Sequence, residues 1–119
     1  MPAMTNPVVH LELCSGNLAA ACAFYGRLFG WRAEKIDVGA ASYFGLDLGH
    51  SVAGGVVECE EDRALWLPYV EVADITEATG RAAELGASVA LAPREGPAGW
   101  RSVVSSPAGG DIALWQPKR

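Results

Sequence analysis

The sequence is short of positive charge, of long hydrophobic runs and of cysteine. Nine Lys and Arg residues stand against fourteen Asp and Glu, a net charge of −5, so a nucleic-acid-binding surface is not expected. No apolar run approaches the roughly 20 residues that span a membrane, and the first seven residues lack the features of a signal peptide. Three cysteines, an odd number with no C-x-x-C pair, indicate a reduced, cytoplasmic protein.

The composition favours one folded domain with many turns. Half of the 119 residues are hydrophobic, enough to build a core, and the length suits a single domain over residues 1–119. Fourteen glycines and seven prolines indicate short elements joined by turns.

The pattern of elements occurs twice, which predicts two modules of strand, helix and three strands at about 8–59 and 65–117. The first helix is expected between an N-cap at Asn17 and a closing Gly30, and the second between Asp74 and Gly86. The loop at 94–99 is interpreted either as a lid or as a hairpin connection. Because one module is too small to bury both of its faces, two modules predict a curved sheet around a cleft, with the helices outside.

The strand predicted at the start of the stretch Val8–Trp31 carries the most informative pattern. Aliphatic residues alternate with His10, Glu12 and Cys14, the period of two of a half-buried strand. The aliphatic face is expected to meet a helical stripe of Leu18, Ala21, Phe24, Tyr25 and Leu28. The imidazole and the carboxylate should therefore face the cleft, whereas Cys14 is expected to be a small core thiol.

Several segments together resemble the vicinal oxygen chelate superfamily, which includes glyoxalase I, extradiol dioxygenases, and fosfomycin- and bleomycin-resistance proteins. They are H-x-E at 10–12, AFYGRLFGW at 23–31, LPYVEVADITEA at 67–78, AAELGA at 82–87 and SPAGGDIALWQP at 106–117. The resemblance covers Val8 to Pro117. It implies an α+β fold of two βαβββ modules in a cupped, mixed sheet of eight strands, often in a homodimer, with a metal or ligand site in the cup.

The resemblance also implies four metal-ligand positions, but only one of them carries a donor here. The positions fall on His10, on Gly54 or Gly55, on Leu67 and on Ala113. A catalytic divalent ion usually takes three protein ligands and water, so no metal and no other cofactor is expected. A weaker metal site is the alternative, with Glu12 beside His10 and further donors from Glu58, His50 or Glu71.

The expected cup offers an aromatic and acidic surface to a ligand. His10 and Glu12 are the polar candidates, and the predicted ligand-binding residues are Tyr43, Leu67, Tyr69, Trp100, Ala113 and Trp115. A carboxylate facing an apolar cup needs water or a cation, supplied by Arg101, Arg32 or the ligand. An aromatic or cationic ligand is therefore expected.

Three functions remain open from the sequence. The preferred one is metal-independent binding of a small molecule, as in the bleomycin-resistance proteins of the superfamily. The second is an enzyme, a lyase, isomerase or dioxygenase, in which His10 holds a divalent metal or acts as a general base. The third is a structural or dimerising module whose cup is filled.

Overall fold

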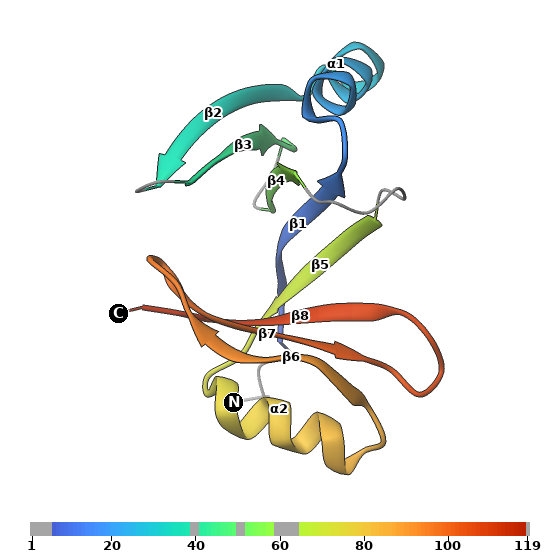
Figure 1. The fold of residues 1–119 in the computed structure, drawn as a ribbon, viewed down its shortest axis with the longest axis vertical. Coiled ribbons are helices and arrows are strands. Elements are labelled where there is room, and N and C mark those ends of the chain that lie inside the picture. Colours follow the sequence, from blue (N-terminus) through green and yellow to red (C-terminus); the bar gives the residue numbers. More distant parts are fainter. Residues whose placement is uncertain (1–5, 39–40, 50–51, 59–64, 119) are drawn as a thin grey trace. The chain divides into compact units, whose positions relative to one another are not determined.

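The computed structural model describes residues 6–38, 41–49, 52–58 and 65–118. Its elements are β1 (Val8–Ser15), α1 (Leu18–Phe29), β2 (Arg32–Val38), β3 (Ala41–Asp47), β4 (Ala53–Glu58), β5 (Leu65–Glu71), α2 (Ile75–Glu84), β6 (Ser88–Glu95), β7 (Gly99–Ser105) and β8 (Asp111–Pro117) (Figure 1). The order strand, helix, strand, strand, strand occurs twice, so the predicted α+β fold of two βαβββ modules is confirmed.

The chain forms two units, each with four strands and one helix. The N-terminal unit is Val9–Leu67, and the C-terminal unit is Pro68–Arg119 with Met1–Val8. In the first, β1 pairs with β4 in parallel, and β4, β3 and β2 follow antiparallel. In the second, β5 pairs with β8 in parallel, and β8, β7 and β6 follow antiparallel. Among the described residues, no helix is long and apolar enough to cross a membrane.

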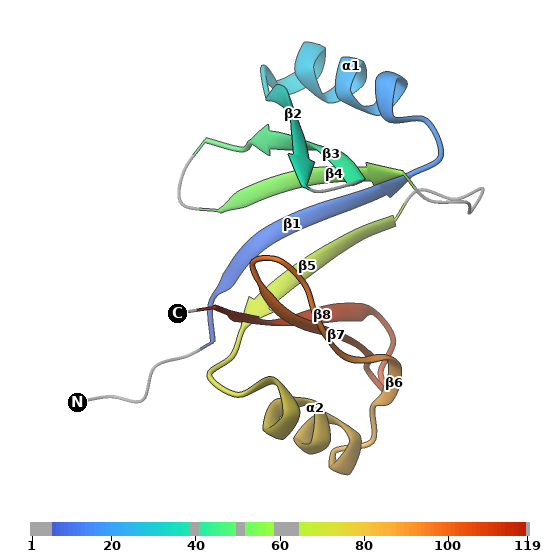
Figure 2. The same ribbon diagram turned by 60° about the vertical axis from the view of Figure 1, so that its left-hand side comes forward.

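The core of the N-terminal unit lies between one face of its strands and α1, which runs along that face (Figure 2). Leu13 of β1 and Val56 of β4 are register partners and are almost fully buried, and Leu46 of β3 completes the cluster. The aliphatic face of β1 therefore meets the helix, as its alternating pattern predicts.

The stripe of α1 is rotated from its predicted position. Leu18, Ala21 and Tyr25 pack against the core, but Phe24 and Leu28 are each 57% exposed. Cys22, and not Phe24 or Leu28, packs against the core together with the first three residues. Because α1 is apolar on most of its circumference, periodicity alone does not mark which side is buried.

Both helices begin and end where the sequence predicts. The side chain of Asn17 accepts a hydrogen bond from the Ala20 N–H at 3.0 Å, and that of Asp74 accepts one from the Glu77 N–H at 3.0 Å. Gly30, with φ of 74°, ends α1 in the left-handed conformation. Gly86, with φ of 104°, follows the C-cap of α2 at Leu85.

The core of the C-terminal unit joins α2 to its strands through apolar and polar contacts. The buried apolar residues are Val72, Ile75, Val104 and Leu114. Beside them, the hydroxyls of Thr79 in α2 and Ser102 in β7 lie 2.7 Å apart, and both residues are buried. The Gln116 side chain accepts a hydrogen bond from the Ile75 N–H at 2.8 Å, which satisfies a further donor at the start of α2.

The loop predicted at 94–99 is shorter than expected. β6 continues to Glu95, and the Gly96 N–H donates to the Gly99 carbonyl at 2.7 Å, which closes a hairpin. Lys118 holds this hairpin, since its N–H donates to the Ala98 carbonyl and its Nζ lies 2.7 Å from a Glu95 carboxylate oxygen. These contacts favour the hairpin interpretation over a lid.

Candidate functional site

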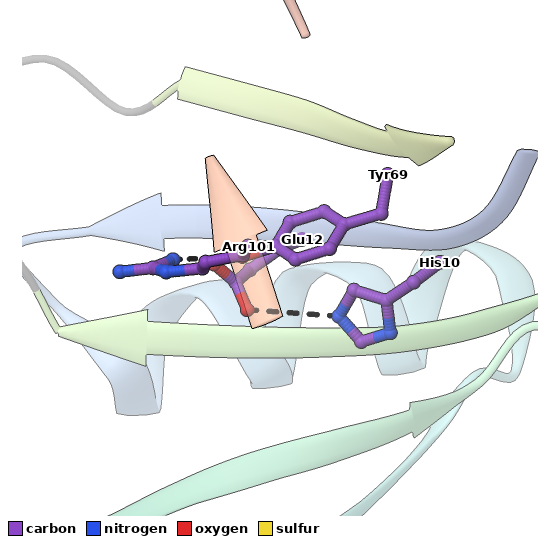
Figure 3. Close-up of polar contacts among 4 residues, drawn as sticks. All are labelled: His10, Glu12, Tyr69 and Arg101. Atoms are coloured by element: carbon purple, nitrogen blue, oxygen red, sulfur yellow. Dashed lines mark hydrogen bonds and ion pairs between the residues drawn. The ribbon is translucent and has the colours of Figure 1, made fainter. Parts of the chain in front are cut away.

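His10 and Glu12 lie side by side on the face of β1 that points away from α1. Being two residues apart on a strand, they share this face, whereas Leu13 points into the helix-side core. His10 Nε2 lies 3.6 Å from Glu12 Oε1, and their side chains are 23% and 17% exposed (Figure 3). This distance is too long for a hydrogen bond. The contact is therefore electrostatic and strengthens when the imidazole is protonated.

The surface next to His10 is bare backbone. The register of β1 and β4 places Gly55 opposite Glu12. A Cβ on Gly55 would lie 3.3 Å from both Cε1 and Nε2 of His10, so the imidazole rests where a side chain would stand. Gly54 faces the other way, against Leu48. The absence of a side chain at Gly55 thus allows the imidazole to lie close against the backbone of β4.

Tyr43 belongs to the same face of the N-terminal unit. It is two residues before Gly45, which is the β3 partner of Gly55, so the strand phase places all three on one side of the sheet. Tyr43 is half-buried and lies opposite Ile36 of β2. Leu67, also predicted to contact a ligand, is half-buried in β5.

In the C-terminal unit, the structure brings Tyr69, Ala113 and Trp115 together. Tyr69 and Ala113 are register partners across β5 and β8, and the rings of Tyr69 and Trp115 have centroids 6.3 Å apart. The Tyr69 hydroxyl accepts a hydrogen bond from Arg101 Nη1 at 2.8 Å (Figure 3). These residues occupy the face of the strands opposite to α2, as their strand phase predicts.

Trp100 does not share this face, and its predicted place with Tyr69 and Trp115 is wrong. It packs against the helix-side core of the C-terminal unit. The physical reason is strand phase, because Trp100 alternates with Arg101 and shares its side with Ser102, which contacts Thr79 of α2.

The sequence predicts Arg101 only as a possible counter-ion for Glu12. The β7–β8 register places it opposite Trp115, and it binds Tyr69. Strand phase indicates its position in the sequence, because Arg101 directly follows Trp100 and therefore points to the opposite face of β7.

The model of the glyoxalase-like domain family matches residues 9–115. This chain belongs to that family. No curated protein matches it. The family and the similar solved structures confirm the resemblance to the vicinal oxygen chelate superfamily.

Solved structures of the same fold are similar to this glyoxalase-like domain at low sequence identity. A hypothetical protein from Bacillus halodurans C-125 has 15% identity and a TM-score of 0.74, with 98% of this chain and 97% of that chain covered. Methylmalonyl-CoA epimerase from Mycobacterium tuberculosis has 15% identity and a TM-score of 0.71, with 100% and 94% covered. A Streptomyces coelicolor methylmalonyl-CoA epimerase in complex with 2-nitronate-propionyl-CoA has 15% identity and a TM-score of 0.66, with 98% and 100% covered.

At the four ligand positions that the resemblance implies, His10 is the only residue with a metal-binding side chain. Of the two glycines considered for the second ligand position, Gly55 is the one that faces His10, and it offers no donor side chain. Leu67 and Ala113 offer none either. Within the described ranges, no three His, Cys, Asp or Glu side chains gather as a metal site. His10 and Glu12 alone fall short of the three ligands that such ions usually take.

The cysteines of this glyoxalase-like domain differ from their predicted state. Cys14 is disulfide-bonded, so its interpretation as a core thiol is wrong. Cys22 is a free, half-buried thiol in α1, and burial raises its pKa. Cys59 and His50 lie outside the described residues.

Proposed function

We propose that this glyoxalase-like domain binds a small aromatic or cationic molecule through the His10 face of its N-terminal unit, without a catalytic divalent metal. The observation that carries the proposal is the position of the His10 imidazole over the bare backbone of Gly55. A metal site there needs a donor side chain, and Gly55 offers none. Tyr43 adds an aromatic side chain on the same face.

Glu12 favours a positive charge on the ligand. Its side chain is only 17% exposed, and a carboxylate in such surroundings interacts more strongly with a cation than it would in water. Leu67 is the further apolar residue of the N-terminal unit that we assign to ligand contact. In the C-terminal unit, Tyr69, Ala113 and Trp115 form a separate apolar surface to which we assign the same role.

A titration with matched probes tests this function. Benzyltrimethylammonium and benzyl alcohol share a ring and differ in charge, and binding is followed by tryptophan fluorescence and calorimetry. Glu12→Gln should weaken binding of the cation about tenfold, which corresponds to ~1.4 kcal/mol, and leave the alcohol unchanged. Glu84→Gln, an exposed change in α2, is the matched control and should alter neither. If neither these probes nor a wider aromatic panel binds, the binding function is refuted.

A second candidate function is proton transfer by His10, and the His10–Glu12 contact favours it. The Glu12 carboxylate lies 3.6 Å from Nε2 and can stabilise the positive charge of the imidazole after it takes up a proton. The neighbouring epimerases suggest a test on methylmalonyl-CoA in deuterated water. A binding protein should incorporate no deuterium, whereas incorporation that is lost in His10→Gln would establish the enzyme. Elemental analysis accompanies this test, since a stoichiometric metal ion would overturn the metal-independent function.

A homodimer and a cytoplasmic location belong to the same proposal. Sedimentation of the purified chain tests the first. Fractionation of the cells that produce the protein tests the second, and the chain should be found in the cytoplasmic fraction. Cys14 is disulfide-bonded in the structure and cytoplasmic cysteines are normally reduced, so recovery of the chain from an oxidising compartment would refute this location.

A further inference from the structure

The side of α1 that points away from its core is exposed and almost wholly apolar. We call it the outer face of α1, and it consists of Ala19, Ala20, Ala23, Phe24, Arg27 and Leu28. Phe24 and Leu28 are each 57% exposed. The helix contains no acidic residue, and Arg27 is its only charged one. The ring of Phe24 is held in place by Tyr25, which it meets edge-on with centroids 5.0 Å apart.

α2 shows that this fold does not require an apolar exterior on its helices. It has the same place in the second module, and its exposed residues are polar, charged or small: Thr76, Glu77, Gly80, Arg81, Ala83 and Glu84. A helix that is apolar on most of its circumference is normally buried on more than one side. Exposed apolar patches of this kind mark surfaces that meet another molecule.

The charge of the chain limits where two copies of it can meet. With a net charge of −5, most contacts between copies bring carboxylates together. The outer face of α1 has no carboxylate, and the stem of Arg27 can lie along an apolar surface while its charged head stays in water. A second copy therefore meets no like-charge repulsion from acidic side chains on this face.

The outer face of α1 is also complementary to itself in shape. Its N-terminal half carries the alanines Ala19, Ala20 and Ala23, and its C-terminal half carries the bulky Phe24 and Leu28. Two copies related by a two-fold axis that passes near Ala23 and Phe24 have antiparallel helices. The bulky half of each helix then lies on the small half of the other, as the matching surfaces of a two-fold interface require.

We propose that two copies of this chain pair through the outer face of α1, helix against helix and antiparallel. The inference rests on the proposed homodimer, whose contact surface it names, and does not depend on the proposed binding of a ligand. Each copy offers roughly 400 Å² on this face, about 800 Å² for the pair, which is in the range of weak and transient contacts. The dimer should therefore dissociate on dilution, with a dissociation constant on the order of 10 μM.

Sedimentation of the full chain from low to high micromolar concentration tests this surface. Phe24→Glu should weaken the dimer at least about tenfold, because two carboxylates then meet near the two-fold axis. Phe24→Lys should weaken it to a similar extent for the same reason. An equal mixture of the two variants should associate more tightly than either variant alone, since opposite charges then meet. A loss of folding would not be reversed by mixing.

Further variants separate this surface from a general effect of charge. Leu28→Gln adds no charge and should weaken the dimer less than Phe24→Glu. Leu85→Glu changes a leucine that is 67% exposed at the C-cap of α2, in the other unit, and should leave the dimer unchanged. Circular dichroism should show the same helix content in every variant, since all three positions are exposed.

The possible outcomes distinguish the inference from the proposals before it. A dimer that persists in Phe24→Glu and Leu28→Gln, equal losses in Leu85→Glu and Phe24→Glu, or folded Glu and Lys variants that do not associate when mixed would overturn the inference and leave the homodimer standing. A chain that is monomeric at every concentration would refute the homodimer as well and leave the outer face of α1 to a different partner. Failure of the ligand-binding function is a separate result, since it shows as an absence of Glu12-dependent binding of benzyltrimethylammonium.

Discussion

The two units share one topology but hold their helices in different ways. α1 of the N-terminal unit contains no fully buried residue, and aromatic rings surround its C-terminal half. α2 of the C-terminal unit buries Ile75 and Thr79 and is joined to its strands by hydrogen bonds. The same order of elements is thus compatible with a broad apolar contact or with a few directed polar ones.

The aromatic contacts of the N-terminal unit centre on Tyr25. Its ring stacks on Trp31 with centroids 5.7 Å apart and meets Trp66 edge-on at 5.3 Å. Trp31 and Trp66 also meet edge-on, at 6.4 Å. Such geometries add a modest attraction to the burial of the rings themselves.

The polar contacts of the C-terminal unit fix α2 at defined points. The Thr79 hydroxyl donates to the Ile75 carbonyl at 2.6 Å and also contacts Ser102, and Gln116 accepts from the Ile75 N–H. Hydrogen bonds depend on direction more than apolar contacts do. We therefore expect the position of α2 to be more sensitive to single polar substitutions, and that of α1 to changes in ring volume.

The largest effect is expected from the apolar core that both units need. Leu13→Ala in β1 removes a side chain that is only 2% exposed, and it should lower the free energy of unfolding by about 2–5 kcal/mol because it leaves a cavity. Urea unfolding followed by circular dichroism measures the change. Leu114→Ala is the matched substitution in the C-terminal unit and should cost a similar amount. A loss below about 1 kcal/mol for Leu13→Ala would contradict the cluster assigned to β1.

A smaller loss is expected from the aromatic cluster. Tyr25→Ala should cost about 2–3 kcal/mol, less than a fully buried ring, because Tyr25 is half-buried. Tyr25→Phe is the control, since it keeps the ring contacts and should change stability little. Near-ultraviolet circular dichroism should report altered tryptophan surroundings in the alanine variant alone. An unchanged spectrum would show that Tyr25 does not order Trp31 and Trp66.

Much of the fold follows from patterns that the chain carries locally. The alternation in β1 and the caps at Asn17 and Asp74 depend on neighbouring residues, and all three predictions are confirmed. The buried side of α1 was misplaced because a helix that is apolar on most sides has no clear stripe. For Trp100, aromatic character favours a ligand-binding role, but the strand phase places the ring on the side of α2.

The candidate site was only partly visible because it depends on register between strands. The sequence shows that His10 and Glu12 share a face, but not that Gly55 lies beneath the imidazole. Nor does it show that Arg94 pairs with Arg101, since the β6–β7 ladder contains register shifts. A slip of one residue would move every side chain to the other face, and no local pattern in these short strands fixes that choice.

A moderate loss is expected from a polar contact of α2. Gln116→Ala leaves the Ile75 N–H without its acceptor and should cost about 1 kcal/mol. Gln116→Glu keeps an acceptor and places negative charge at a helix N-terminus, so its stability should equal or exceed that of the unmodified chain. Thermal unfolding of both variants measures the difference. Equal losses in the two variants would show that packing, not the hydrogen bond, is the role of Gln116.

The smallest effect compares a glycine in each helix. Gly80 of α2 has no heavy atom within 4 Å of an added Cβ, so Gly80→Ala should stabilise the fold by about 0.4–1 kcal/mol by restricting the unfolded chain. In α1, a Cβ on Gly26 would lie 3.3 Å from the Trp31 carbonyl oxygen, a backbone atom that moves only with the chain that follows the helix. Gly26→Ala should therefore gain less than Gly80→Ala or lose stability. Equal increases in the melting temperature of the two variants would show that α1 can shift to accommodate the methyl group. The aromatic contacts that hold α1 would then be more adaptable than the polar contacts that hold α2.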